Sequence, residues 1–257
     1  MIELSRYVLE ALRKDEEFIL YRGRSQDDTS RAAFASRLRQ ATACPDSSEM
    51  QSPEVGRVLV LSPVAEHPSP ESVRRLEHAY SLKEELDPAW AARPVDLARH
   101  RDRMVLVLED PGGKPLDRFG GFGETRPTGP HALDLGLCFR IGINLANAIG
   151  HLHRRGIVHK DIKPANVLVN SATDRVWLLG FGIASRFPRE RQSPDFPEFL
   201  EGTLAYMAPE QTGRMNRSID SRSDLYSLGI TLYEMVTGSL PFTASDPMEW
   251  VQEAGAS

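Results

Sequence analysis

The segment His159-Lys160-Asp161-Ile162-Lys163-Pro164-Ala165-Asn166 is the most informative stretch of this 257-residue sequence. An aspartate can accept a proton from a hydroxyl group, a lysine can neutralise a phosphate, and an asparagine can help to hold a cation. The same residue types are common in polar turns, so the stretch alone is also compatible with a purely structural turn. Apolar residues recur at helical spacing from Leu133 to Leu152 and end before Gly156, which predicts a long helix leading into this segment.

The sequence resembles the eukaryotic-type serine/threonine protein kinases at three motifs that occur in the order of that family. The segment 159–166 resembles the catalytic loop. Gly202-Thr203 with Tyr206-Met207-Ala208-Pro209-Glu210 resembles the end of the activation segment. Asp224-Leu225-Tyr226-Ser227-Leu228-Gly229 resembles the start of the buried helix of the large lobe. The resemblance covers nearly the whole chain.

This resemblance implies a role for each matching residue. Asp161 would orient or deprotonate the acceptor hydroxyl, and Lys163 would lie against the transferred phosphoryl group. Asn166 would bind a magnesium or manganese ion at an ATP site. Asp224 would brace the backbone of the catalytic loop. The positions that support catalysis structurally would be His159, Thr203, Glu210 and Asp224.

An adenine-binding segment is also implied by the resemblance. It comprises Leu106, Val107, Leu108, Glu109 and Asp110, and it is followed by Pro111-Gly112-Gly113. In the family, backbone groups of this segment hydrogen-bond the adenine, and such recognition does not depend on the side chains. A purine site could therefore persist in this chain without catalysis.

The metal-binding motif departs from the family pattern. Gly180-Phe181-Gly182 stands where Asp-Phe-Gly is expected, and a glycine has no side chain with which to coordinate a metal ion. The nearest acidic residue upstream is Asp174, in a turn, which is a poor position for a substitute. Loss of this carboxylate should lower phosphoryl transfer by orders of magnitude.

The N-terminal part departs from the pattern twice more. Val58 to Pro63 contains no lysine to anchor the phosphates, and Glu77 is an uncertain partner on the candidate helix. Tyr21-Arg22-Gly23-Arg24 stands in place of the glycine-rich, phosphate-covering loop, with a single glycine. Arg22 and Arg24 could contact phosphates, or they could be solvated charges at a strand end.

The fold expected is α+β, a two-lobed protein-kinase fold with a small β-rich N-lobe and a mainly helical C-lobe. The N-lobe would span 1–110 with an inserted loop at 25–54. The C-lobe would span 111–257 and would be incomplete, with a truncated C-terminus, because the chain stops before the last helices of the family. What completes that lobe is left open.

Short apolar runs and capping signals predict the individual elements. A helix should begin after Ser69 with Pro70, place Leu76 and Leu86 on its apolar face, and stop at Asp87-Pro88. Strands are expected at Phe18–Tyr21, Val58–Leu61, Met104–Leu108, Val167–Val169 and Val176–Leu179. A second buried helix should bury Leu225, Leu228, Leu232, Met235 and Val236 and end at Gly238.

From the composition we expect neither a nucleic acid nor a membrane as a partner. The formal net charge is −5 and the pI is about 5.8, which gives no general attraction to nucleic acid or to an anionic membrane. The apolar runs noted above are of strand length, so no membrane span is expected. Two cysteines are too few for a disulfide framework, which favours a reducing compartment, the cytoplasm.

Two functions remain open. The first is a serine/threonine protein kinase-like signalling domain whose phosphoryl transfer from ATP to protein hydroxyls is weak or conditional. The second is a pseudokinase that acts as an interaction or nucleotide-sensing module. Thr212 to Asp224, with Gly180-Phe181-Gly182, also resembles bacterial proteins in which a kinase-like head precedes an ATPase module, sensor segments and a histidine kinase. Partners would then be protein substrates or domains of the same polypeptide.

Overall fold

The computed structural model describes residues 2, 4–25, 56–119, 134–186, 203–212 and 218–242. The chain divides into two compact units, Met1–Gly112 and Gly113–Ser257. The sequence placed this division at residues 110 and 111. The inserted loop predicted at 25–54 lies almost entirely outside the described residues.

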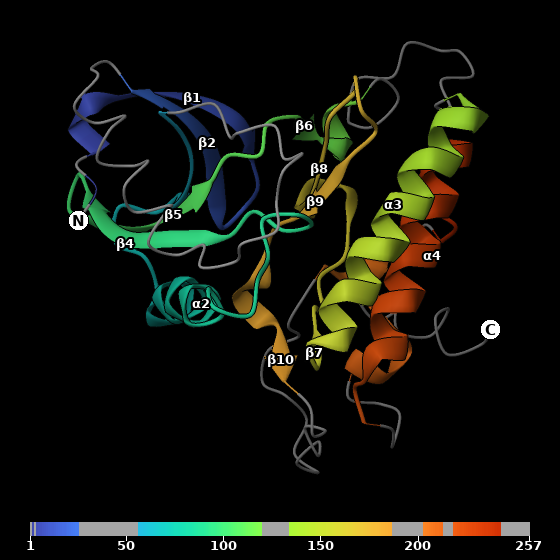
Figure 1. Cartoon of the computed structure of the whole chain (residues 1–257). Helices are drawn as coiled ribbons and strands as arrows, with labels where there is room; N and C mark the ends of the chain where they lie inside the picture. Colours follow the sequence, from blue (N-terminus) through green and yellow to red (C-terminus); the bar gives the residue numbers. More distant parts are fainter. Residues whose placement is uncertain are drawn as a thin grey trace. The chain divides into compact units, whose positions relative to one another are not determined.

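Among its described residues, the first unit contains a five-stranded antiparallel sheet and the helix α2 (Figure 1). The strand order is β1-β2-β3-β5-β4. The elements of this unit are η1 (Leu4–Arg6), β1 (Tyr7–Lys14), β2 (Phe18–Ser25), β3 (Arg57–Pro63), α2 (Pro70–Ser81), β4 (Pro94–His100) and β5 (Arg103–Glu109).

The central strands of this sheet are buried on both faces. Val58, Leu59 and Val60 of β3 are fully buried, as are Val105 and Val107 of β5. Strands with both faces covered have continuous apolar runs, which is why β3 and β5 were predictable. The edge strands β1 and β4 mix apolar and charged residues, and the sequence analysis missed both.

Helix α2 begins as predicted and ends earlier. The Ser69 side chain accepts a hydrogen bond from the Ser72 N–H, and Pro70 occupies the first turn. The prediction that the helix continues to Asp87-Pro88 was wrong. The helix ends at Ser81, and the N–H groups of Glu85 and Leu86 bond the Leu82 carbonyl in tighter turns. Leu86 is nevertheless buried, because these turns direct it inward.

The second unit is built from two long helices and short strands (Figure 1). Its strands form a β10-β7 pair and a sheet of order β6-β8-β9. The elements are β6 (Lys114–Pro115), η2 (Leu116–Arg118), α3 (Leu135–Arg154), β7 (Ile157–Val158), η3 (Pro164–Asn166), β8 (Val167–Val169), β9 (Val176–Leu178), η4 (Phe181–Ile183), β10 (Ser185–Arg186), η5 (Leu204–Tyr206), η6 (Pro209–Thr212) and α4 (Ser221–Thr237).

Helix α3 confirms the predicted long helix and packs beside α4 and β9. Asp134 caps its first turn, and Gly156 follows its end with a φ of +72°. By length and composition alone α3 could cross a membrane, with a mean hydropathy of 1.2 over its most apolar window. The buried helix of a folded domain has the same composition, and the apolar face from Ile141 to Leu152 is buried inside the unit.

Helix α4 ends at Gly238 as predicted, but its buried face differs from the predicted one. Leu228 and Met235 are buried, whereas Leu225 and Val236 are about half exposed. The buried face also carries polar residues. Ser223, Asp224 and Ser227 bond to neighbouring loops, and Thr231 donates to the Ser227 carbonyl of the same helix. The spacing of apolar residues did not predict the buried face of α4, because part of that face is polar and bonds to loops.

Candidate functional site

The segment 159–166 forms a loop between β7 and β8 in the second unit. Lys160 adopts a φ of +70°, and Pro164–Asn166 form the short helix η3 that leads into β8. The Gln211 side chain donates a hydrogen bond to the Lys160 carbonyl at 2.9 Å. The loop is therefore held near Lys160 and at its junction with β8. These contacts fix the backbone positions of Asp161 and Lys163.

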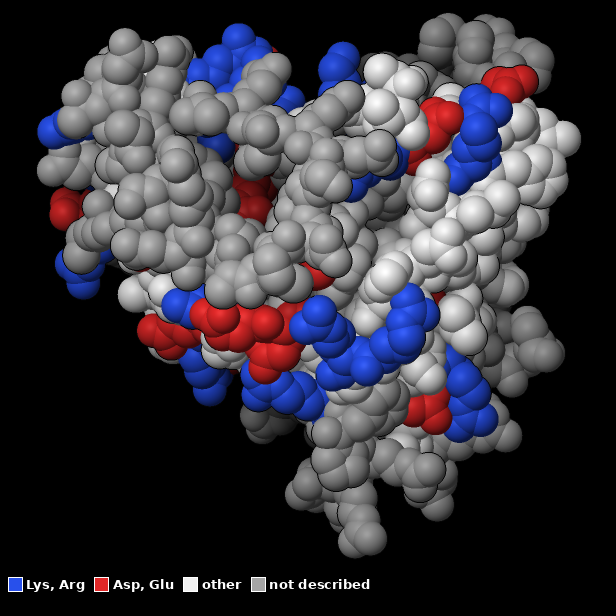
Figure 2. Space-filling model, viewed as in Figure 1, with Lys and Arg blue, Asp and Glu red and all other residues white. Residues whose placement is uncertain are grey.

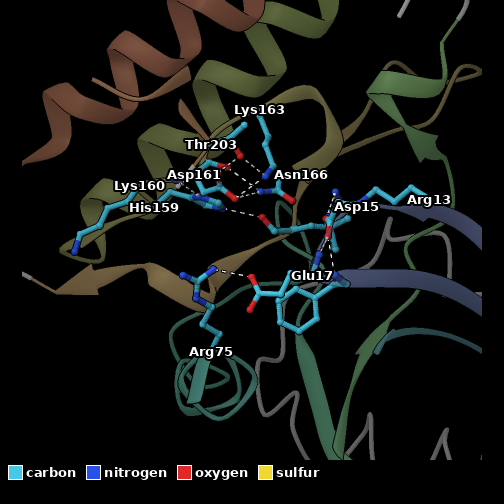
Figure 3. Close-up of polar contacts among 12 residues, drawn as sticks. Arg13, Asp15, Glu17, Arg75, His159, Lys160, Asp161, Lys163, Asn166 and Thr203 are labelled. Carbon is cyan, nitrogen blue, oxygen red and sulfur yellow. Dashed lines mark hydrogen bonds and ion pairs between the residues drawn. The ribbon is translucent and has the colours of Figure 1, made fainter. Parts of the chain in front are cut away.

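The Asp161 carboxylate is the centre of a polar network (Figure 3). Its Oδ1 accepts a hydrogen bond from the Thr203 hydroxyl at 3.0 Å, and its Oδ2 accepts one from the Asn166 amide at 2.7 Å. Lys163 Nζ lies 3.1 Å from Oδ2 and also donates to the Thr203 hydroxyl. The structure thus brings together four of the predicted site residues. The network orients a carboxylate that can accept a proton.

His159 is buried and links the loop to the end of β9. Its Nδ1 accepts from the Asp161 N–H at 3.2 Å, so Nε2 carries the proton and donates to the Leu179 carbonyl at 2.8 Å. Burial lowers the pKa of His159, which favours this neutral form. The ring also packs against Phe181 with centroids 4.8 Å apart. His159 therefore supports the loop and does not face the reaction.

Asp224 braces the loop from α4. Its Oδ2 accepts from the His159 N–H and its Oδ1 from the Lys160 N–H, both at 2.8 Å, and the side chain is fully buried. A third donor comes from α3, where His153 Nε2 lies 2.8 Å from Oδ2. Because this contact joins residues 71 positions apart, no local pattern pointed to it.

The segment 203–212 is attached to α4 by side chains. The Ser223 hydroxyl donates to Glu210 Oε1 at 2.6 Å. The Tyr206 hydroxyl donates to Glu234 Oε2 at 2.6 Å, and burial together with this acceptor raises the pKa of Tyr206. In the described part of the chain Glu210 therefore has a partner on α4.

The residues around Gly180 do not fit the magnesium ion that the resemblance implies. Gly180 lies at a φ of +84°, and a Cβ there would come within 2.6 Å of the Asn166 side chain. The Asn166 amide nitrogen is bonded to the Asp161 carbonyl and carboxylate, and the amide oxygen is the one side-chain atom of Asn166 that could ligate a metal ion. Asp174 is bound to Arg140 of α3 at 2.6 Å. Over the described residues no three His, Cys, Asp or Glu side chains form a metal site.

The segment 106–110 in the first unit is held by two arginines. Arg22 of β2 forms two hydrogen bonds with the Asp110 carboxylate, at 2.6 and 3.1 Å, and Arg93 pairs with Glu109. Burial raises the pKa of Glu109, while Arg93 opposes this effect. The Glu109 N–H donates to the Arg93 carbonyl and the Gly112 N–H to Asp110. Arg22 is thus a structural residue, which contradicts both alternatives considered for it.

The segment Tyr21–Arg24 does not form a phosphate-covering loop, because it lies inside β2. The turn between β1 and β2 is instead Asp15-Glu16-Glu17 (Figure 3). Asp15 Oδ1 accepts from the N–H groups of Glu17 and Phe18, and Glu17 Oε2 pairs with Arg75 of α2 at 2.7 Å. Two of the three carboxylates in this turn are paired, Asp15 with Arg13 and Glu17 with Arg75. The turn nevertheless lacks the glycines that allow the backbone to approach a polyphosphate closely.

Charge on the visible surface is mixed. Figure 2 shows basic and acidic side chains beside one another, with no broad surface of one sign among the described residues on this face. This distribution agrees with the small net charge of −5. It supplies no general attraction for a polyanion.

Comparison with protein families gives a match to the model "Protein kinase domain" over residues 92–255, which is more than half of the chain. Serine/threonine-protein kinase PknB of Mycobacterium tuberculosis is 43% identical over 101 residues. This match covers 39% of the present chain and 16% of PknB.

Two other relatives support the same relationship. A probable serine/threonine-protein kinase of Clostridium perfringens is 33% identical over 178 residues, which is 69% of this chain and 24% of that protein. Probable PknB of Bifidobacterium longum is 40% identical over 106 residues, or 41% of this chain and 15% of the relative. The chain thus matches less than a quarter of the length of each of these curated relatives.

Proposed function

Because the chain belongs to the protein kinase family, we propose that it is a serine/threonine kinase-like signalling domain with weak or conditional phosphoryl transfer from ATP to protein hydroxyls. The family membership agrees with the α+β, two-lobed fold expected from the sequence, with its β-rich N-terminal sheet and helical second unit. Substrates would be proteins, in keeping with the names of the relatives.

The observation that carries this proposal is the network around Asp161. Thr203 and Asn166 hold one carboxylate oxygen each, so the group is oriented before a substrate arrives. An acceptor hydroxyl would replace one of these donors and give its proton to the carboxylate as its oxygen attacks the γ-phosphorus of ATP. The bond from that phosphorus to the β,γ-bridging oxygen would break, and ADP would leave with the bonding electron pair. Lys163, now paired with Asp161, supplies a positive charge that can compensate the phosphoryl group.

The weakness of transfer follows from the missing metal ligand. A divalent ion normally neutralises the charge between the phosphates, and here Gly180 provides no carboxylate for it. Transfer would depend on Lys163 and on any condition that brings another cation to the phosphates.

The wider setting is proposed from the sequence resemblance. The chain would act as the kinase-like head of a bacterial signalling polypeptide with a histidine kinase, and other domains of that polypeptide would be its partners. The expected compartment is the cytoplasm. The matches cover only 16% and 24% of two of the relatives, which is compatible with a multidomain arrangement.

A pseudokinase is the second candidate function, and two observations favour it. The β1–β2 turn carries Asp15, Glu16 and Glu17 in place of glycines, and Gly180 lacks a metal-binding carboxylate. In this case the unit around Asp161 would serve as an interaction or nucleotide-sensing module. The intact Asp161 network is the observation that favours the enzyme instead.

Replacing Asp161 with alanine tests the first function. The Asp161→Ala variant should incorporate at least about 100-fold less labelled phosphate from ATP into a general acceptor protein, because the general base is lost. The matched control is Asp174→Asn, at an acidic residue of the same unit whose described contacts are with Arg140 and Asn144 of α3. Equal incorporation by both variants would mean that the signal is not due to this site.

A further inference from the structure

His153 is the residue of α3 whose side chain contacts the buried Asp224 carboxylate. It lies in the last turn of the helix, and its ring reaches the buried Asp224 carboxylate of α4. The same Oδ2 atom also accepts the His159 N–H at 2.8 Å. His153, α4 and the catalytic loop therefore meet at one carboxylate oxygen.

The chemistry of this contact is directional. A carboxylate only accepts hydrogen bonds, so His153 must carry its proton on Nε2 to bind Asp224. Donation by three groups satisfies Oδ1 once and Oδ2 twice. Without His153, the Asp224 group could rotate about its last torsion angle, and the two backbone N–H groups would lose their fixed acceptors.

We propose that His153 is a positioning residue that holds the Asp224 carboxylate in the orientation required by the catalytic loop. The expected effect on catalysis rests on the proposed function. The expected effect on the orientation of Asp224 rests on the hydrogen bonds alone. His153 touches none of the residues around the acceptor hydroxyl. It acts through Asp224, then through the His159 and Lys160 amides, on the adjacent Asp161.

The path to Asp161 is short and continuous. The Lys160 amide precedes Asp161 directly, and the Asp161 N–H is itself bonded to the His159 ring. A change in the Asp224 orientation therefore alters two backbone bonds of the loop next to the general base. Because a misplaced base lowers turnover more than nucleotide affinity, the effect should fall on kcat and leave KM for ATP nearly unchanged.

Two conservative substitutions separate positioning from packing. In His153→Gln the side-chain amide nitrogen can occupy the place of Nε2 and donate to Asp224. In His153→Asn the amide matches Nδ1 instead and falls short of the carboxylate. Both variants replace the imidazole by a neutral amide, so the comparison depends on donor position. His151→Ala, an exposed histidine in the same turn, is the control for changes at the end of α3.

The primary measurement is hydrogen exchange of the His159 and Lys160 amides in the full chain without nucleotide. We expect exchange in His153→Asn to be about tenfold faster than in wild type, as for loss of a hydrogen bond to a charged group, and near wild type in His153→Gln and His151→Ala. Equal protection in the Gln and Asn variants would overturn the proposal.

Parallel kinetics keep the two hypotheses distinct. If wild type transfers phosphate, kcat should fall about tenfold in His153→Asn and recover in His153→Gln, with KM for ATP constant. If no variant transfers phosphate but the amides respond as expected, the positioning role stands and the proposed enzyme function fails. If phosphate transfer is normal in wild type and the amides do not respond, only the positioning role fails.

Discussion

Gly180 shows how one residue changes the chemistry of its neighbours. A glycine at a φ of +84° costs little, whereas a residue with a side chain meets both backbone strain and the Asn166 amide. Asn166 in turn donates to Asp161, so the space next to Gly180 is part of the network around the general base. Restoring a carboxylate at this position would therefore disturb the residue that should share the metal.

Substitution at Gly180 should destabilise the chain. We expect Gly180→Asp and Gly180→Ala each to lower the free energy of unfolding by about 1–2 kcal/mol, the cost of a left-handed residue, as measured by urea unfolding. The alanine variant separates strain from the added charge. Wild-type stability in both variants would show that Asn166 moves aside readily, and Gly180→Asp would then be expected to increase metal-dependent ATP binding.

At the residue scale, the family motifs named Asp161, Lys163, Asn166 and Thr203 as candidate site residues. The structure brings these four together, although Thr203 lies 42 positions after Asp161. The sequence could not predict that Arg22 pairs with Asp110 or His153 with Asp224. Both contacts join residues more than 70 positions apart, and only folding decides which polar side chains meet.

At the scale of elements, the ion pair between Glu17 and Arg75 connects α2 to the turn between β1 and β2. Kinases commonly hold the equivalent helix through a lysine of the sheet and a glutamate of the helix. In the pair described here, the helix supplies the cation and the β1–β2 turn supplies the carboxylate. Apolar runs did not predict β1 and β4, because these strands lie at the edges of the sheet and mix apolar with charged residues.

A double-mutant cycle measures how strongly this pair holds α2. Glu17→Gln and Arg75→Gln should show a coupling free energy of about 0.5–1 kcal/mol, the upper range for a partly exposed ion pair. The matched control is the pair Glu71 and Arg74 on the outer face of α2, which is largely exposed and should couple by less than about 0.5 kcal/mol. Similar coupling in the two pairs would contradict a special role for Glu17 in holding the helix.

For the whole molecule, the question is whether ATP and a metal ion bind together. Family membership favours ATP binding, while Gly180 and the acidic Asp15–Glu17 turn oppose a metal-bound triphosphate. Family membership and these two segments of the chain thus favour opposite answers. Ligand-induced stabilisation reports on the entire chain and compares these contributions directly.

Thermal unfolding of the full chain should respond to ATP equally in magnesium, manganese and EDTA. At about 100 times Kd, a ligand that binds only the folded state adds about 2.7 kcal/mol, which raises Tm by several degrees. Metal independence is expected because Asn166 offers one amide oxygen and Gly180 offers no ligand. AMP is the control, since it lacks the phosphates that would need a cation. A shift that requires metal would contradict the argument from Gly180 and favour the enzyme, whereas no shift with any ligand would favour an interaction module without nucleotide.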